Sequence, residues 1–267
     1  MKTVLTIGAT DPTSGAGIQM DLKVFHSLDI YGLSIITAVT AQSTSEFVLT
    51  YPLPVEIIEA QFETLLKDIK PYGAKTGMLY SRETIQCIVE KIKKFNIKNL
   101  VVDPIITSTL GAKLIEPEAL EILKEELIPL SMAVTANIPE AEALTELKIE
   151  KIDDAFEALQ KLHKMGTSIA IIKGGHWGTP KSRRLFGDPL KEKAVDMLYD
   201  GKNFHKIEDE KYPGEFHGTG CAFSSAFISF LCLGYEPKEA FNATKKFIKN
   251  SILNALKLGR GMNLLKI

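Results

Sequence analysis

A glycine-rich turn, His217-Gly218-Thr219-Gly220-Cys221, directly precedes an apolar segment over residues 222–233 that is expected to be a helix. Two glycines allow the backbone to fold tightly and to point several N–H groups at one place, where the positive end of the helix dipole also lies. Such a turn can bind an anion and can stabilise the charge that develops on a phosphoryl group during its transfer. A plain turn, whose glycines serve only backbone geometry, is the alternative interpretation.

Two further loops combine glycines with a charged side chain. Lys173-Gly174-Gly175-His176 follows the apolar run 168–172, and its lysine and backbone amides can hold a nucleotide phosphate. The loop over residues 8–17 contains three glycines, which let a small substrate approach the backbone while Asp11 accepts hydrogen bonds from it. A strand-end turn with a solvated lysine and a flexible connection are the respective alternatives.

A fourth cluster, Asn137-Ile138-Pro139-Glu140, follows the apolar run that ends near residue 135. Its amide oxygen and carboxylate stand three residues apart, and hard oxygen ligands of this kind suit Mg²⁺, usually together with water. The same pattern is typical of a helix start, with Asn137 as the N-cap and Glu140 at the third helical position. The residues alone leave both interpretations open.

The bulk composition limits the class of protein. The chain has 267 residues, of which 45% are hydrophobic and 24% are charged, and its net charge of −1 gives no strong attraction to nucleic acid or to an anionic membrane. No apolar run approaches the roughly 20 residues of a membrane helix. Its three cysteines are scattered without a CxxC pair, which fits a reducing cytoplasm. A P-loop motif is absent, and the first loop lacks the third glycine of the dinucleotide fingerprint.

Apolar strand-like runs alternate with segments of helical period along the chain. The expected strands cover residues 4–7, 33–39, 74–78, 99–102, 132–135 and 168–172, and the expected helices cover 16–29, 54–70, 117–127, 153–165, 222–233 and 237–258, with further helices starting after Ser81 and at Pro139. This alternation predicts an α/β fold with a mainly parallel sheet covered on both faces, and ligands bind beyond the carboxyl ends of such strands. Asp200-Gly201 predicts a hairpin within 194–211 and therefore an antiparallel edge. We expect a single domain over 1–267, with residues 178–193 as a surface loop.

Taken in order, these segments resemble the ribokinase-like superfamily, and specifically its hydroxymethylpyrimidine/phosphomethylpyrimidine kinases. The resemblance implies a three-layer α/β/α fold. The segments that carry it are Thr10-Asp11-Pro12, 15–19, Asp21-Leu22-Lys23, 37–42, 75–79, Val102-Asp103-Pro104, 137–140, 173–176 and 217–221.

The resemblance also implies a reaction: transfer of the γ-phosphate of ATP to the hydroxymethyl group of 4-amino-5-hydroxymethyl-2-methylpyrimidine, usually followed by phosphorylation of the monophosphate. The expected substrate-binding residues are Gln42, Asp11, Ala16, Gly17, Asp21 and Met78. Those expected at ATP and its phosphates are Lys173, Gly174, Thr219 and Asn137, with Glu140 and Asp103 at Mg²⁺. Gly218 and Gly220 are expected to hold the transferred phosphoryl group. Dimers are common among the proteins it resembles, so a homodimer is expected.

Cys221 stands where many ribokinase relatives carry an aspartate as catalytic base. Its position at a helix start, among backbone N–H groups, is expected to favour the thiolate, which can accept the proton of the substrate hydroxyl. Phosphoryl transfer depends more on positioning and charge neutralisation than on a base. A small residue that only packs beside the anion site is therefore the alternative role of Cys221.

Two other activities compete with this interpretation. The first is a pyridoxal kinase of the same fold, and the second is a sensor that binds the thiamine precursor without phosphorylating it. Gln42 and Cys221 favour the pyrimidine kinase, and the presence of both glycines and acids disfavours the sensor. The first loop departs from the family pattern at Ala9 and at Thr13-Ser14, where added side chains can narrow the pocket or stiffen the loop. Residues 212–216 also replace the family's threonine-rich approach to His217.

Overall fold

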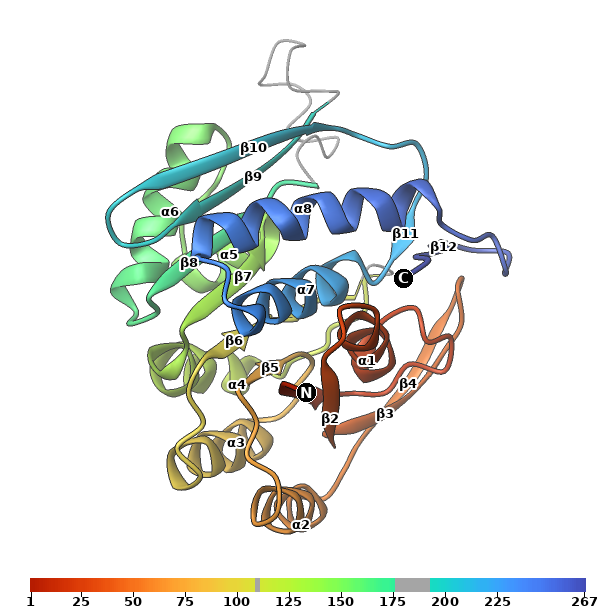
Figure 1. The fold of residues 1–267 in the computed structure, drawn as a ribbon, viewed down its shortest axis with the longest axis vertical. Helices are drawn as coiled ribbons and strands as arrows, with labels where there is room; N and C mark the ends of the chain where they lie inside the picture. The colour runs from red at the N-terminus through yellow and green to blue at the C-terminus, as the bar shows by residue number, and fades with distance from the viewer. Residues whose placement is uncertain (109–110, 176–192) are drawn as a thin grey trace.

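The computed structural model describes residues 1–108, 111–175 and 193–267. Within them, eight strands form one sheet in the order β10-β9-β8-β7-β6-β5-β1-β2. Neighbouring strands from β2 to β8 run parallel, whereas β9 is antiparallel to both β8 and β10. The predicted mainly parallel sheet with an antiparallel edge is therefore confirmed (Figure 1). The strands of this sheet are β1 (Thr3–Gly8), β2 (Tyr31–Ile36), β5 (Gly73–Thr76), β6 (Leu100–Val102), β7 (Ala133–Asn137), β8 (Ile169–Lys173), β9 (Lys193–Tyr199) and β10 (Phe204–Glu210).

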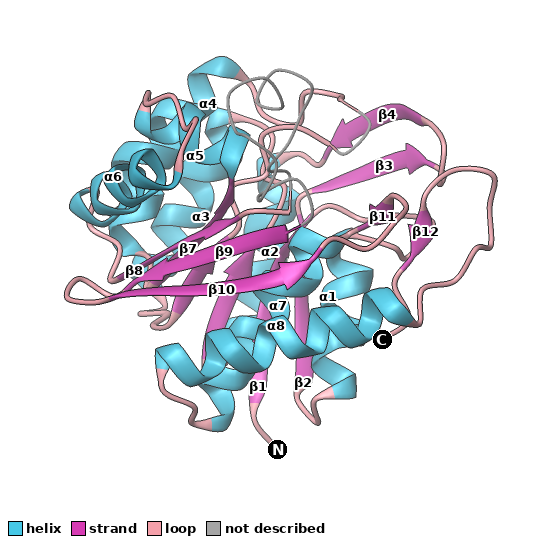
Figure 2. Ribbon diagram, turned by 90° about the horizontal axis from the view of Figure 1, so that it is seen from above, coloured by secondary structure: helices cyan, strands magenta, loops and turns pink. Residues whose placement is uncertain are grey.

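Helices cover both faces of the sheet, and Figure 2 shows the resulting three layers. The first face is covered by α2 (Val55–Leu66), α3 (Arg82–Lys94), α4 (Pro117–Ile122), α5 (Ile138–Thr145) and α6 (Ile152–Lys164). The second face is covered by α1 (Gly17–Ser27), α7 (Thr219–Leu233) and α8 (Pro237–Leu253). None of these helices, in the described part of the chain, is both long and apolar enough to cross a membrane.

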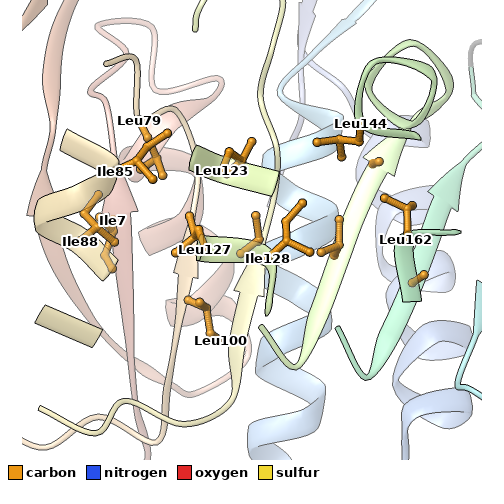
Figure 3. Packing of buried hydrophobic residues seen from close by; sticks show 14 of the residues in the cluster. Ile7, Leu79, Ile85, Ile88, Leu100, Leu123, Leu127, Ile128, Leu144 and Leu162 are labelled. Atoms are coloured by element: carbon orange, nitrogen blue, oxygen red, sulfur yellow. The ribbon is translucent and has the colours of Figure 1, made fainter. Parts of the chain in front are cut away.

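Alternate residues of the strands face the two helical layers, which explains why the central strands read as continuous apolar runs. On β1, Leu5 and Ile7 pack into the cluster under α2–α6, whereas Val4 packs into the cluster under α1, α7 and α8. Figure 3 shows part of the first cluster around Ile7, Ile85 and Leu127. Each large apolar side chain removed from water in this way contributes about 1.5–3 kcal/mol.

Local sequence sets most of the element ends. The Ser81 side chain accepts a hydrogen bond from the Thr84 N–H and begins α3, as predicted. Gly234 ends α7 in the left-handed conformation, with φ 98°. Gly201 forms the predicted hairpin turn between β9 and β10 with φ 88°. The expected loop over 178–193 lies outside the described residues except for Lys193, which begins β9.

Two expected elements differ from the structure. The single strand expected over 33–39 is divided at Thr37, whose hydroxyl donates to the Met78 carbonyl oxygen. The chain then leaves the sheet as a separate antiparallel hairpin of β3 (Ala38–Gln42) and β4 (Phe47–Pro52), which stands apart in Figure 2. The helix expected over 237–258 ends at Leu253, because Leu256 instead forms two backbone hydrogen bonds with Leu264.

Candidate active site

A cavity of about 610 Å³ lies beyond the carboxyl ends of the parallel strands. Its wall includes Gly8 at the end of β1, Met78 after β5, Asp103 after β6, and Asn137 and Lys173 at the ends of β7 and β8. Polar residues that are far apart in the sequence are thus gathered at one edge, because parallel strands end on the same side of the sheet.

The glycine turn forms one side of this cavity and begins α7, as predicted. Gly218 has φ 78°, and a side chain there would overlap the carbonyl oxygen of Gly15. A Cβ atom on Gly220 would lie 3.3 Å from the Lys173 Nζ and 4.0 Å from the Asp103 Oδ2. The turn therefore stands directly beside a lysine and an acid from other strand ends. Thr219 lines the same wall.

Asp103 and Lys173 form a buried ion pair at the centre of the site. The Lys173 Nζ lies 2.8 Å from the Asp103 Oδ1, and the Ser224 hydroxyl donates to the Asp103 Oδ2 over 3.1 Å. Burial raises the pKa of Asp103, but the positive charges of Lys173 and Lys75 outweigh it and hold this pKa below the usual value. Conversely, the pKa of Lys173 is raised by Asp103 and Glu140, against the effect of burial. The pair therefore stays charged.

Asn137 and Glu140 form a capping box at the start of α5. The Glu140 N–H donates to the Asn137 Oδ1 over 2.9 Å, and the Asn137 N–H donates to the Glu140 Oε2 over 2.7 Å. The helix-capping interpretation is thus confirmed. Both residues also line the cavity. Burial raises the pKa of Glu140 to about 7, and the nearby negative charge of Asp103 adds to this rise.

The donor set of Asp103 and Glu140 fits a hard divalent cation. The negative charge of Asp103 raises the pKa of Glu140, because the two carboxylates repel each other. A cation bound between them would relieve this repulsion. Among the described residues, no group of three or more His, Cys, Asp or Glu side chains is placed to hold a metal ion. An Mg²⁺ ion here would therefore take its remaining ligands from water and phosphate oxygens, as is usual for this ion.

Cys221 lines the cavity but is 7% exposed. Burial raises the pKa of its thiol to about 12 against the lowering effect of the Lys75 charge, and the negative charges of Asp21 and Asp103 add to the rise. The expectation that the helix start favours the thiolate is wrong for the free protein, because burial disfavours the charged form of the thiol. Cys87 and Cys232 are buried and free as well.

Asp11 lies behind the cavity wall. Its carboxylate accepts hydrogen bonds from the Thr13 and Ala16 N–H groups over 2.9 and 2.8 Å, and its Oδ2 lies 2.8 Å from the His217 Nε2. Although burial raises the pKa of Asp11, the hydrogen bond and charge of His217 hold it below the usual value. The structure does not bring this carboxylate to the cavity, and it instead fastens the first loop to the glycine turn.

Asp21 reaches the cavity wall, but its acceptors are engaged. Its two oxygens lie 3.0 Å from the Lys75 Nζ and accept the Thr6 and Ser225 hydroxyl groups over 2.6 and 2.7 Å. Lys75 is fully buried, and burial alone would lower its pKa, but Asp21, Cys221 and Asp103 together raise it above the usual value. Sequence reasoning gave Lys75 no role, although a lysine inside the buried strand β5 is the signal of a buried partner.

Gln42, Met78, Ala16 and Gly17 also line this cavity. The Gln42 Nε2 donates to the Thr40 hydroxyl over 3.0 Å, and that hydroxyl donates to the Thr10 carbonyl oxygen. The hairpin β3–β4 thereby places the Gln42 amide beside the first loop. This amide offers both a donor and an acceptor to a ring.

Gly174 differs from its expected role. Its N–H donates to the Asp196 Oδ1 over 2.7 Å, and Gly175 rather than Gly174 lines the cavity. Asp196 in turn pairs with Lys245 of α8, with 2.6 Å between the Lys245 Nζ and the Asp196 Oδ2. Both side chains line the cavity and were not identified from the sequence, because their pairing joins an edge strand to a distant helix.

An α/β sheet whose strand ends carry a glycine turn at a helix start, a lysine–aspartate pair and a second acid is typical of enzymes that phosphorylate small molecules. The family model described as phosphomethylpyrimidine kinase matches residues 11–266. The chain belongs to this family and is a phosphotransferase, as predicted.

The similar proteins are kinases of two small-molecule classes. The hydroxymethylpyrimidine/phosphomethylpyrimidine kinase of Bacillus subtilis (strain 168) is 38% identical over 96% of this chain and 91% of its own. A crystal structure of phosphomethylpyrimidine kinase from Clostridium difficile 630 is 40% identical, with a TM-score of 0.80, over 94% of this chain and 100% of the other. The pyridoxal kinase of Staphylococcus aureus, solved in complex with AMP-PCP and pyridoxal, is 33% identical with a TM-score of 0.86, over 100% and 93%.

Proposed function

We propose that this protein transfers the γ-phosphate of ATP to the hydroxymethyl oxygen of 4-amino-5-hydroxymethyl-2-methylpyrimidine and then phosphorylates the resulting monophosphate. One observation carries the proposal: the Gly220 turn, the Lys173–Asp103 pair and the Gln42 amide line a single cavity. An anion site and a ring-reading amide in one cavity are what a phosphoryl acceptor of this kind requires.

At the substrate end, Gln42 hydrogen-bonds the pyrimidine ring, while Ala16, Gly17 and Met78 frame it. The side chain of Met78 is 6% exposed and packs with Ala38, so it forms a fixed apolar surface for the ring. Asp11 acts on the substrate indirectly in this proposal, because its carboxylate holds the loop that carries Ala16. Asp21 likewise supports the wall through its ion pair with Lys75.

At the phosphate end, Lys173 and the first turn of α7 receive the transferred group. Thr219, Gly220 and Asn137 line this end, and Gly218 allows the turn to lie against Gly15. Positioning and charge stabilisation of this kind carry most of the catalysis in phosphoryl transfer. Asp103 and Glu140 would hold Mg²⁺, which supplies neutralisation of phosphate charge when it is bound.

Cys221 is proposed as the acceptor of the hydroxyl proton, from the side of α7 that faces the substrate end. Because the thiol is neutral in the free protein, its own proton must first pass to solvent water in the cavity before the thiolate accepts the hydroxyl proton. Lys75 is the buried cation that favours this loss, since its charge lowers the pKa of Cys221.

Product analysis by mass tests the proposal directly. Purified protein incubated with ATP, Mg²⁺ and the hydroxymethylpyrimidine is expected to add first one and then two phosphoryl groups to the pyrimidine. Production of the monophosphate alone would limit the activity to the first step. The absence of any phosphorylated pyrimidine would overturn the proposal.

Pyridoxal is the second candidate substrate, because a pyridoxal kinase matches the whole chain with a TM-score of 0.86. Steady-state kinetics with both substrates distinguish the two activities. We expect the larger kcat/KM for the pyrimidine, and a much larger value for pyridoxal would reverse the assignment.

We further propose that the protein is a cytoplasmic homodimer. Its three cysteines are free, which suits a reducing compartment. The hairpin β3–β4 exposes apolar side chains, including Val48 at 74% and Tyr51 at 60%, and a second copy of the chain can cover them. Light scattering is expected to give twice the chain mass, and Val48→Asp is expected to yield monomers. A monomeric wild-type protein at micromolar concentration would contradict the proposal.

A further inference from the structure

The end of the chain crosses back over the active-site loops. After α8, Leu256 and Leu264 pair through backbone hydrogen bonds of 2.8 and 2.9 Å, and the chain between these two leucines forms a loop. We call residues 259–265 the C-terminal strap. Figure 1 shows its strand β12 (Asn263–Leu264) beside β11 (Phe216–His217) and near the tip of the β3–β4 hairpin.

The first part of the strap is hydrogen-bonded to the turn between β3 and β4. The Met262 N–H donates to the Thr44 carbonyl oxygen over 2.9 Å, and the Gly261 N–H donates to the Thr44 hydroxyl over 3.2 Å. Thr44 is 9% exposed and follows Gln42 by two residues. The strap therefore fixes the backbone immediately after the proposed ring-reading amide.

This contact leaves no room for side chains on the strap glycines. A Cβ atom on Gly261 would overlap the Thr44 carbonyl oxygen, and one on Gly259 would overlap the Thr44 hydroxyl. Neither glycine adopts a left-handed backbone, so close approach, rather than backbone conformation, requires glycine at both positions.

The second part of the strap pairs with the strand that leads into the glycine turn. Strand β12 pairs in parallel with β11, and the Asn263 N–H donates to the Glu215 carbonyl oxygen over 2.9 Å. The Leu264 side chain packs against Gly15, where a Cβ atom would lie 2.6 Å from its Cδ2. Leu264 is 9% exposed and thereby anchors both the first loop and the approach to Gly218.

We propose that the C-terminal strap is a positioning element that sets the distance between Gln42 and the Gly218–Cys221 turn, and so places the substrate hydroxyl against the transferred phosphoryl group. This proposal rests on the proposed function. Residues 259–265 do not line the cavity, so the strap acts through the two loops that it holds. A misplacement of about 1 Å between reacting groups can cost about a hundredfold in rate.

Gly259→Ala tests the strap, because its new methyl group must displace the Thr44 side chain. We expect kcat for the pyrimidine to fall about tenfold or more, while the KM for ATP stays within twofold. Thr44→Ala removes the hydroxyl and methyl that the new Cβ meets, and it also removes the acceptor of the Gly261 N–H. The double variant Gly259→Ala/Thr44→Ala is therefore expected to be faster than Gly259→Ala and about as fast as Thr44→Ala alone. Arg260→Ala, at an exposed position of the same segment, is the matched control and should retain the wild-type kcat.

Two outcomes would overturn the proposal: a wild-type kcat in folded Gly259→Ala, or a double variant that is no faster than Gly259→Ala. If Gly259→Ala does not fold, Thr44→Val replaces it, because valine keeps the shape but cannot accept from Gly261. That variant is expected to lose about threefold to tenfold in kcat and to speed amide hydrogen exchange over residues 42–47. Unchanged exchange and kcat would again refute the strap.

The exchange measurement does not depend on the substrate. It therefore separates the two possible failures. If the wild-type protein does not phosphorylate the pyrimidine, the proposed function is refuted. If Thr44→Val does not change the amide exchange rates of residues 42–47, the role of the strap is refuted.

Discussion

Gly220→Ala should separate the stability of the fold from the chemistry of the turn. Gly220 is the second residue of α7, and no left-handed backbone requires glycine there. Alanine in a helix is more favourable than glycine by up to about 1 kcal/mol, and contact with the Lys173 Nζ at 3.3 Å offsets part of this gain. We expect the free energy of unfolding to be unchanged or up to about 1 kcal/mol greater, which raises Tm by about 2–4 °C at most.

The same methyl group occupies the space between the turn and Lys173, where the transferred phosphoryl group is proposed to lie. Loss of one donor contact in an anion site typically lowers kcat by about 10²–10³. Thermal unfolding and steady-state kinetics on the same preparation test both expectations. Full activity in Gly220→Ala would show that the phosphoryl group does not bind at this turn.

Gly218→Ala is the contrasting variant, because its Cβ would overlap the Gly15 carbonyl oxygen and its φ is 78°. It is expected to lose both stability and activity. If the two alanine variants behaved alike, the distinction between a structural glycine and an anion-site glycine would be wrong.

Further variants test the other parts of the site. Gln42→Ala is expected to raise the KM for the pyrimidine and leave that for ATP unaltered, and an equal loss for both would contradict the assignment. Cys221→Ala should lower kcat far more than it changes pyrimidine affinity, whereas an unaltered kcat would remove the proton-acceptor role. Lys75→Met is expected to cost about 3–5 kcal/mol in a denaturant titration, because Asp21 is left charged and unpaired, and a loss below about 1 kcal/mol would show the pair to be dispensable. The raised pKa of Glu140 means that the folded state holds a proton which the unfolded state releases between pH 4.5 and about 7, so stability should fall as pH rises through this window, and Glu140→Gln should flatten that slope.

The sheet and its strand-end loops could be predicted because burial on both faces forces continuous apolar strands. The runs that became β6 and β8 contain almost only branched aliphatic residues, and the polar residues that follow them fall at one edge by topology alone. The turn at Gly218 could be predicted from local sequence, since a glycine pair directly precedes an apolar helix.

Features that depend on distant contacts could not be predicted. The hydroxyl of Thr37 divides an apolar run because it bonds the Met78 carbonyl oxygen 41 residues away, and this creates the hairpin that carries Gln42. The protonation of Cys221 depends on its burial and on Asp21 and Asp103, which local sequence does not reveal. The strap glycines have no periodicity, and only their closeness to Thr44 explains them.

The bond between Asp11 and His217 spans 206 residues, and this separation bears on how the protein is made. At about 5–20 residues per second, the first loop leaves the ribosome roughly 10–40 s before its partner is synthesised. Until then, Asp11 is a carboxylate without its histidine, and the face of β1 that packs under α7 and α8 is not yet covered. Contacts of such long range slow folding, because the chain must close a large loop before they form. The N-terminal third of the nascent chain therefore stays exposed for a long interval, during which chaperones can bind it. Catalytic activity should appear only after release of the completed chain.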